Sequence, residues 1–307
     1  MLIRPEGMLH PGGGLTKLCP MLVIRTLPDL RAACAALRAA RGSLGLVPTM
    51  GALHRGHRAL VRAAVSAGGA SVASIFVNPL QFGPNEDLSR YPRDEPGDLA
   101  ALEAEGCDVA WLPDVATMYP ADEATSITVA GPAERWEGEA RPGHFRGVAT
   151  VCAKLFGQVR PDAAYFGEKD WQQLQTVKRM VADLLLPLEV AGIETVREPD
   201  GLALSSRNRF LTVAERDQAP LLYAAMTAAA RTLTDGGAAD PILAEARERL
   251  TAGGFAVDYF ALVDGPSLTP IDAATPGARL IAAARLGSVR LLDNMAVQAG
   301  VLPSSPR

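Results

Sequence analysis

Two periods of apolar positions alternate along the first two thirds of the chain. Short apolar runs have the length of strands, and between them lie longer stretches whose apolar residues recur every three or four positions. The short runs predict strands at 22–25, 44–48, 71–77, 108–112, 163–166 and 188–193. The amphipathic stretches predict helices at 28–40, 54–67, 98–105, 148–159 and 174–185. Strands that alternate with helices form a parallel sheet covered by helices on both faces.

The pattern changes near residue 195. Ala-rich helices are predicted first and strands afterwards, at 212–234, 241–252, 256–263, 278–286 and 289–297. Helices followed by a run of strands favour a smaller α+β domain. The sequence therefore predicts an α/β protein: a Rossmann-like doubly wound parallel sheet with a second, smaller α+β C-terminal domain. The expected parts are a disordered N-terminal extension at 1–20, a Rossmann-like domain at 21–195 and the C-terminal domain at 196–307.

Charge and composition exclude several classes of protein. The chain has 307 residues, with 30 basic and 34 acidic side chains and a net charge of −4, which argues against a general nucleic-acid binder. The longest uncharged run, 63–85, contains glycines and prolines, so we expect no membrane span. The four cysteines show no C-x-x-C spacing, and residues 1–20 lack the apolar stretch of a secretion signal. We expect a cytoplasmic location.

Polar residues gather at three predicted strand ends, at 48–57, 78–81 and 167–173. In open parallel sheets, ligands bind outside the carboxyl ends of the strands. His54 and His57 are three residues apart and share one face of a helix start, which suits a phosphate group. No further His or Cys pair shows the spacing of a zinc site.

Other polar groups fit the same kind of ligand. Lys169 and the run Ser205-Ser206-Arg207 suit phosphate oxygens, and the amides of Asn78, Gln81 and Gln173 suit hydroxyl and carboxylate groups. Each cluster alone is also typical of an ordinary cap or solvated turn, and we expect His144 to orient a loop. The chain contains neither a G-x-S-x-G elbow nor a Walker-type phosphate loop, which favours electrostatic phosphate chemistry over covalent catalysis.

Five stretches in order strengthen this interpretation: PTMGALHRGH, SIFVNPLQFGPNEDLSRYPR, RPGHFRGVATV, YFGEKDWQQL and DGLALSSRNRFL. Together they resemble the pantothenate synthetase (pantoate–β-alanine ligase) family of the nucleotidylyltransferase superfamily, densely over 21–211. The resemblance implies ATP-dependent condensation of pantoate with β-alanine through a pantoyl adenylate, with release of AMP and pyrophosphate. It also implies Mg²⁺, a closing C-terminal lid and usually a homodimer.

The resemblance further implies roles for individual residues. The expected catalytic and cationic set is His54, His57, Lys169 and Arg207. The expected ATP-binding residues are Met50, Gly51, Ala52, Leu53, His54, Arg55, Gly56, His57, Gly167, Glu168, Lys169, Asp170, Val196, Leu204, Ser205, Ser206 and Arg207. Gln81, Gln173 and Asn78 are expected to bind pantoate and β-alanine. Asp98 is the candidate metal ligand, although Gly97 precedes it where some members have a second acidic residue.

Two other functions stay open on the residues alone. The chain could be another nucleotidylyltransferase with a different acceptor, or a non-catalytic ATP-binding protein. The neutral amides at 78–81 and 172–173 argue against a phosphorylated acceptor, which would call for more positive charge.

Overall fold

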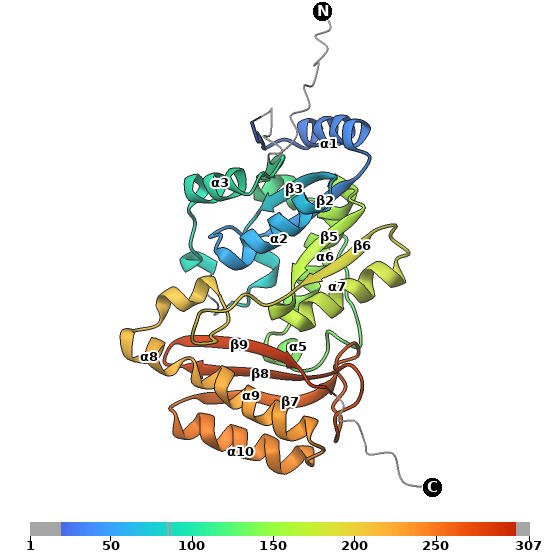
Figure 1. Cartoon of the computed structure of the whole chain (residues 1–307). Helices are drawn as coiled ribbons and strands as arrows, with labels where there is room; N and C mark the ends of the chain where they lie inside the picture. The colour runs from blue at the N-terminus through green and yellow to red at the C-terminus, as the bar shows by residue number, and fades with distance from the viewer. Residues whose placement is uncertain (1–19, 85, 87, 299–307) are drawn as a thin grey trace, which may run out of the picture.

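Six parallel strands form the larger of two sheets, in the order β1-β4-β3-β2-β5-β6 (Figure 1). The structure is a computed structural model that describes residues 20–84, 86 and 88–298. The strands are β1 (Leu22–Ile24), β2 (Leu44–Thr49), β3 (Ala70–Ile75), β4 (Val109–Trp111), β5 (Ala163–Gly167) and β6 (Glu189–Ile193). The chain adds β3 on one side of β2 and later β5 on the other, so the winding direction reverses at the β2–β5 pair. The predicted doubly wound sheet is confirmed.

Helices cover both faces of this sheet because its side chains alternate between two cores. Leu46 of β2 belongs to the core under α1, α6 and α7, while its neighbour Val47 belongs to the core under α2 and α3. The α-helices are α1 (Leu27–Arg41), α2 (Arg55–Ser66), α3 (Glu95–Ala104), α4 (Val115–Met118), α5 (Glu137–Ala140), α6 (His144–Val159) and α7 (Trp171–Asp183). Short 3-10 turns are η1 (Pro79–Gln81), η2 (Leu88–Arg90), η3 (Glu168–Asp170) and η4 (Ser206–Phe210).

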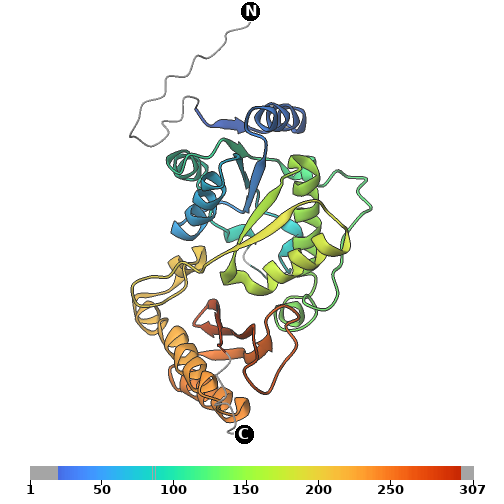
Figure 2. The same cartoon turned by 45° about the vertical axis from the view of Figure 1, so that its right-hand side comes forward.

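A three-stranded antiparallel sheet, in the order β7-β8-β9, forms a separate unit with its own core (Figures 1 and 2). Its elements are α8 (Val213–Gln218), α9 (Leu221–Thr234), α10 (Ala239–Ala252), β7 (Ala256–Asp264), β8 (Ala278–Leu286) and β9 (Val289–Ala296). The prediction of one helix at 212–234 is wrong, because α8 ends before Pro220. Proline has no backbone N–H to continue a helix, and here it stands at the N-cap of α9.

The small sheet lies against the carboxyl ends of the large one. The side-chain amide of Asn294, in β9, donates to the carbonyl oxygens of Glu168 (2.8 Å) and Lys169 (2.7 Å), which directly follow β5. Trp171 donates from its indole to the carbonyl oxygen of Gly265 (2.7 Å), between β7 and β8. Any ligand at the strand ends is therefore bounded by the second sheet.

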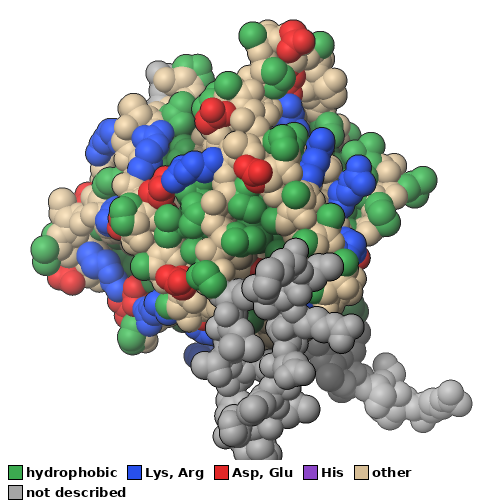
Figure 3. Space-filling model, turned by 90° about the horizontal axis from the view of Figure 1, so that it is seen from above, with side chains coloured by type: hydrophobic (Ala, Val, Ile, Leu, Met, Phe, Trp, Pro, Cys, Tyr) green, Lys and Arg blue, Asp and Glu red, His purple; other side chains and the backbone are tan. Residues whose placement is uncertain are grey.

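Two expectations concern the outside of the molecule. The expected extension at 1–20 falls almost entirely outside the described residues. In the part of the chain that is described, no helix has the length and apolar character needed to cross a bilayer. Lys and Arg side chains lie among Asp and Glu side chains on the face shown in Figure 3.

Packing of α6 against η1 generates a stability prediction. A Cβ atom on Gly147 would lie 2.3 Å from the carbonyl oxygen of Leu80, whereas one on Gly157 of the same helix would meet nothing within 4 Å. We expect Gly147→Ala to lower the free energy of unfolding by about 1–3 kcal/mol. Gly157→Ala should raise it by up to about 1 kcal/mol, because alanine is the better helix former. Urea unfolding measures both, and equal stability of the two variants would contradict the packing argument.

Candidate functional site

The three predicted polar clusters come together at the centre of the large sheet. They follow β2, β3 and β5, which are neighbours in the order β3-β2-β5. The segment 50–57 leads from β2 into α2, η1 follows β3, and η3 leads from β5 into α7. This is the edge at which the winding direction of the sheet reverses, the usual ligand site of doubly wound folds.

His54 and His57 form a stacked pair at the start of α2, with ring centroids 4.0 Å apart. The Nδ1 atom of His54 accepts from the backbone N–H of Gly56 (3.1 Å), and Nδ1 of His57 accepts from the N–H of His54 (3.3 Å). A neutral ring that accepts at Nδ1 carries its proton on Nε2. Each histidine therefore has one Nε2–H group available as a donor.

Both imidazoles are neutral at pH 7 in this ligand-free structure. Burial, together with the charge of Lys169, lowers the pKa of His54 to about 4. Burial, followed by the neighbouring His54, lowers the pKa of His57 to about 3. The pair is therefore uncharged in this structure, and its expected cationic role toward a phosphate group stays a prediction. The charge of Lys169 contributes to the lowering of both pKa values.

Asp98 holds the turn before α2. One of its carboxylate oxygens accepts from the N–H of Ala52 (2.9 Å) and the other from Leu53 (2.7 Å). Gly51 and Ala52 both have positive φ, of 80° and 50°, and a Cβ atom on Gly51 would lie 2.7 Å from Oδ2 of Asp98. The aspartate is 3% exposed. It therefore stabilises a backbone conformation that few residues adopt.

The expectation that Asp98 is a metal ligand stays a prediction: each of its oxygens already accepts one backbone hydrogen bond from the turn. Among residues 20–84, 86 and 88–298, no group of three or more His, Cys, Asp or Glu side chains could hold a metal ion.

Asn78 has no hydrogen-bonding capacity left for a substrate. Its amide nitrogen donates to Oε1 of Gln81 and to the carbonyl oxygen of Gly147, both at 3.1 Å. Its oxygen accepts from Leu80 N–H (3.2 Å) and from the Tyr119 hydroxyl (2.6 Å). The expectation that Asn78 contacts substrate is therefore corrected: this residue, 1% exposed, positions Gln81.

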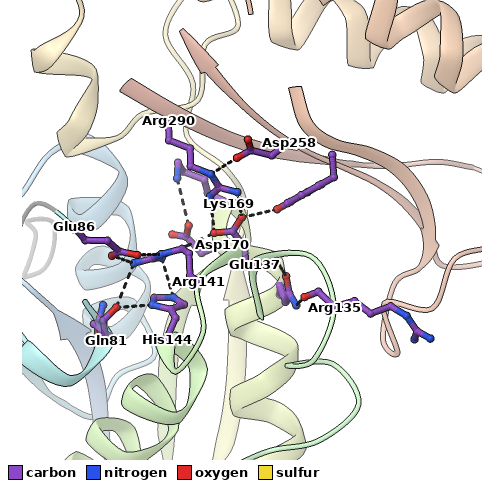
Figure 4. Close-up of polar contacts among 12 residues, drawn as sticks. Gln81, Glu86, Arg135, Glu137, Arg141, His144, Lys169, Asp170, Asp258 and Arg290 are labelled. Atoms are coloured by element: carbon purple, nitrogen blue, oxygen red, sulfur yellow. Dashed lines mark hydrogen bonds and ion pairs between the residues drawn. The ribbon is translucent and has the colours of Figure 1, made fainter. Parts of the chain in front are cut away.

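The backbone of Gln81 is fixed as firmly as its side chain (Figure 4). Its carbonyl oxygen accepts from Nδ1 of His144 (2.9 Å) and from Nη2 of Arg141 (3.3 Å). Burial and the charge of Arg141 lower the pKa of His144 to about 4, so the ring is neutral and its Nε2 accepts from Arg141 (3.1 Å). Glu86 binds Arg141 through two hydrogen bonds, of 2.8 and 2.6 Å.

His144 thus orients a loop, as expected, while sequence reasoning missed Arg141 and Glu86. The run RPGHF was the available signal, because it places an arginine three residues before the histidine. Gln172 is also structural: it donates to Pro132 O (2.9 Å) and Arg135 O (2.7 Å). Gln173 lines a small pocket of about 40 Å³ together with Lys169 and His144.

A cleft of about 1010 Å³ adjoins this pocket between the two sheets, and Lys169, Ser205 and Arg207 line it. The Lys169 ammonium group lies 3.4 Å from Asp170. Burial raises the pKa of Asp170, but the charge of Lys169 outweighs this effect and keeps the carboxylate ionised. His54, His57 and Gln81 are not among the residues that line either hollow.

The remaining candidates contribute mainly through structure. Val196 and Leu204 are joined by a backbone hydrogen bond of 3.0 Å, and Ser205 caps η4 by accepting from Arg207 N–H (3.3 Å). Arg55 pairs with Glu198 (2.6 Å), and Glu168 pairs with Arg279 of β8 (3.1 Å). These contacts tie the strand ends of the large sheet to the segments that follow it.

A doubly wound sheet that presents neutral donors and cations beside a cleft between two domains defines a nucleotide-binding α/β enzyme. A sequence model of the pantoate-beta-alanine ligase family matches residues 22–296. The chain belongs to this family.

Similar proteins agree over nearly the whole chain. The pantothenate synthetases of Granulibacter bethesdensis and Acidiphilium cryptum are each 59% identical, over 90% of this chain and 96% and 100% of their own. A crystal structure of pantothenate synthetase from Thermus thermophilus is similar with a TM-score of 0.86 and 50% identity, over 91% of this chain and 100% of that one. A Francisella tularensis pantoate-beta-alanine ligase, complexed with "Beta-gamma ATP and Beta-alanine", has a TM-score of 0.77 and 32% identity, over 91% and 99%.

The role of Asp98 can be tested without substrates. An amide in Asp98→Asn can accept only one of the two backbone hydrogen bonds, so the free energy of unfolding should fall by about 1–3 kcal/mol. Glu103→Gln, at an exposed acidic residue of the same helix, is the control. Added Mg²⁺ should change the thermal unfolding temperature of the wild type and of Asp98→Asn by the same amount. Stabilisation by Mg²⁺ in the wild type alone would instead support a metal-ligand role for Asp98.

Buried neutral histidines predict a pH dependence of stability. In the unfolded chain a histidine binds a proton near pH 6.5, whereas folded His144 binds one only near pH 4. Its contribution to stability is therefore complete above pH 6.5 and is lost as the pH falls toward 4, by up to about 1.4 kcal/mol per pH unit. Urea unfolding between pH 7 and 4.5 should give a shallower decline for His144→Gln than for the wild type. Parallel declines would refute the assignment.

Proposed function

We propose that this protein condenses pantoate with β-alanine at the expense of ATP. In the first step a carboxylate oxygen of pantoate attacks the α-phosphate, pyrophosphate leaves, and a pantoyl adenylate forms. In the second step the amine of β-alanine attacks the acyl carbon, AMP leaves, and an amide bond forms. The observation that carries the proposal is the convergence, at the ends of β2, β3 and β5, of a fixed Gln81, two Nε2–H donors and the Lys169 ammonium group.

The charges fit the first step. Attack on the α-phosphate builds negative charge on its oxygens and on the leaving pyrophosphate, and fixed donors at those positions stabilise the transition state. We assign this role to His54, His57, Lys169 and Arg207, with the histidines acting as neutral donors. Gln81 and Gln173 would bind pantoate through hydrogen bonds from uncharged amides, which suit its hydroxyl and carboxylate groups.

The remaining ATP contacts belong to the same proposal. They are the segments 50–57 and 167–170, Val196 and the run 204–207, which border the strand ends or the cleft. The Gly51–Leu53 turn, which Asp98 fixes, would give the first of these segments its shape, and Leu204 is buried. The domain at 21–195 would then bind ATP and pantoate, and the domain at 196–307 would act as a lid.

Mg²⁺, a homodimer and a cytoplasmic location stay predictions. Because each oxygen of Asp98 accepts a hydrogen bond from a backbone N–H group, a Mg²⁺ ion would be held mainly by ATP oxygens and water. No step above depends on a metal ligand from the protein.

Lys169 offers a sharp test of the first step. Lys169→Ala should lower the rate of adenylate formation by about 10²-fold or more, because it removes charge stabilisation from the transition state. Lys178→Ala, at an exposed lysine of α7, is the matched control. Isotope exchange of pyrophosphate into ATP with pantoate alone measures this step. Unchanged exchange in Lys169→Ala would remove Lys169 from the mechanism.

The reaction itself is tested by measuring AMP and pyrophosphate released from MgATP. Release with an amide product, when both pantoate and β-alanine are present, is the expected result. ATP binding without turnover of any carboxylate would favour the non-catalytic alternative. Turnover with a different acceptor would favour another nucleotidylyltransferase.

A further inference from the structure

One segment of the large domain touches both the small sheet and the residue that we assign to pantoate. This segment, residues 132–141, lies between α4 and α6 in the chain and contains the short helix α5. It is held at one end by the side chain of Gln172, which bonds to Pro132 O, Arg135 O and the N–H of Glu137. At its other end, Arg141 bonds to the carbonyl oxygen of Gln81.

Glu137 carries the contact with the small sheet. Its carboxylate accepts a hydrogen bond from Nη1 of Arg290 of β9 (2.8 Å) and one from the Tyr259 hydroxyl of β7 (2.9 Å), and it forms an ion pair with Nη2 of Arg290 at 2.6 Å (Figure 4). The Glu137 side chain is 6% exposed and that of Arg290 is 15% exposed. Burial lowers the pKa of Arg290, but the bond to Glu137 outweighs this and holds the guanidinium charged. A paired, charge-assisted contact of this kind is directional and strong.

Backbone strain marks the same contact from both sides. Trp136 and Leu268 are non-glycine residues with positive φ, of 56° and 58°. They bond to each other across the interface, from the Trp136 indole N–H to the carbonyl oxygen of Leu268 (2.9 Å). Non-glycine residues adopt this conformation only where the surroundings enforce it, and such residues cluster at switch regions. Here each strained residue is held by the other domain.

The two ends of the segment are mechanically linked, since Glu137 and Arg141 are one helical turn apart. Arg141 N–H donates to the carbonyl oxygen of Glu137 (2.9 Å), and the two side chains approach to 4.0 Å. Displacing Glu137 would therefore displace the guanidinium group that fixes Gln81. We propose that the segment 132–141 couples docking of the small sheet to the placement of Gln81, with Glu137 as the positioning residue.

The coupling can be tested by hydrogen exchange in the ligand-free protein, independently of any activity. Glu137→Gln keeps the shape of the side chain but faces Arg290 with an amide donor, which leaves that guanidinium incompletely paired. We expect at least about tenfold faster exchange both in peptides covering 134–146 and in those covering 79–84, since a charge-assisted hydrogen bond is lost. Arg290→Lys, which keeps the charge but loses the paired geometry, should show the same pattern, and it serves if Glu137→Gln does not fold.

Asp258→Asn is the matched control. Asp258 binds the same Arg290 (2.5 Å) but belongs to the small sheet, so it does not bridge the domains. Its exchange pattern should match the wild type. The proposal is overturned if folded Glu137→Gln exchanges as the wild type does, if only 134–146 and not 79–84 responds, or if Asp258→Asn responds equally.

A second readout rests on the proposed function. The KM for pantoate of Glu137→Gln should rise about tenfold while that for ATP changes little, and AMP should be released in excess over amide because the adenylate meets water. A folded variant with the wild-type KM for pantoate and equal AMP and amide would overturn the coupling. If the wild type itself forms no AMP from pantoate, the proposed function fails, and the exchange measurement alone decides the coupling.

Discussion

The parallel pairing of β3, β2 and β5 is the constraint on which the site depends. Because the three strands run in one direction side by side, the segments that follow them must start from the same edge. That edge collects groups far apart in the sequence: a histidine pair, an amide turn and a lysine turn. The small sheet then covers the same edge. The functional groups are therefore enclosed, although they lie on the segments that follow the strands and not within the strands.

Buried polar side chains translate this arrangement into a defined geometry. Asp98 fixes the turn after β2, Asn78 fixes the turn after β3, and Gln172 fixes the loop that precedes α6. Each uses its hydrogen bonds on backbone or on another positioning group. An unpaired polar group at such depth would cost about 1–3 kcal/mol, so each network is stable only when all its members are in place. The residues that can still bind a ligand are those whose positions Asp98, Asn78 and Gln172 fix.

Apolar periodicity was sufficient to predict the sheet and most of its helices, because buried strands and amphipathic helices differ in period. This periodicity failed where the buried residues are polar or are glycines. The start of α6 was predicted at 148 rather than at His144, since a buried histidine and a packed glycine break the apolar pattern. The helix α5 has only four residues and therefore no detectable periodicity, so the sequence pattern could not predict the domain contact at Glu137. Asn78 was found as a polar residue at a strand end and Asp98 through the family resemblance, but only their hydrogen bonds separate a positioning group from a ligand.

The protonation of the histidines follows from the same enclosure. Burial, together with the charge of Lys169, lowers the pKa of both rings, so His54 and His57 remain neutral and accept backbone hydrogen bonds at their Nδ1 atoms. Fixed neutral donors cost little to desolvate before a phosphate arrives, and they add hydrogen bonds as negative charge develops. A site built from cations alone would carry a desolvation cost for each of them. The division between neutral donors on α2 and the charges of Lys169 and Arg207 therefore lets one enclosed edge accept a polyanion while remaining stable without it.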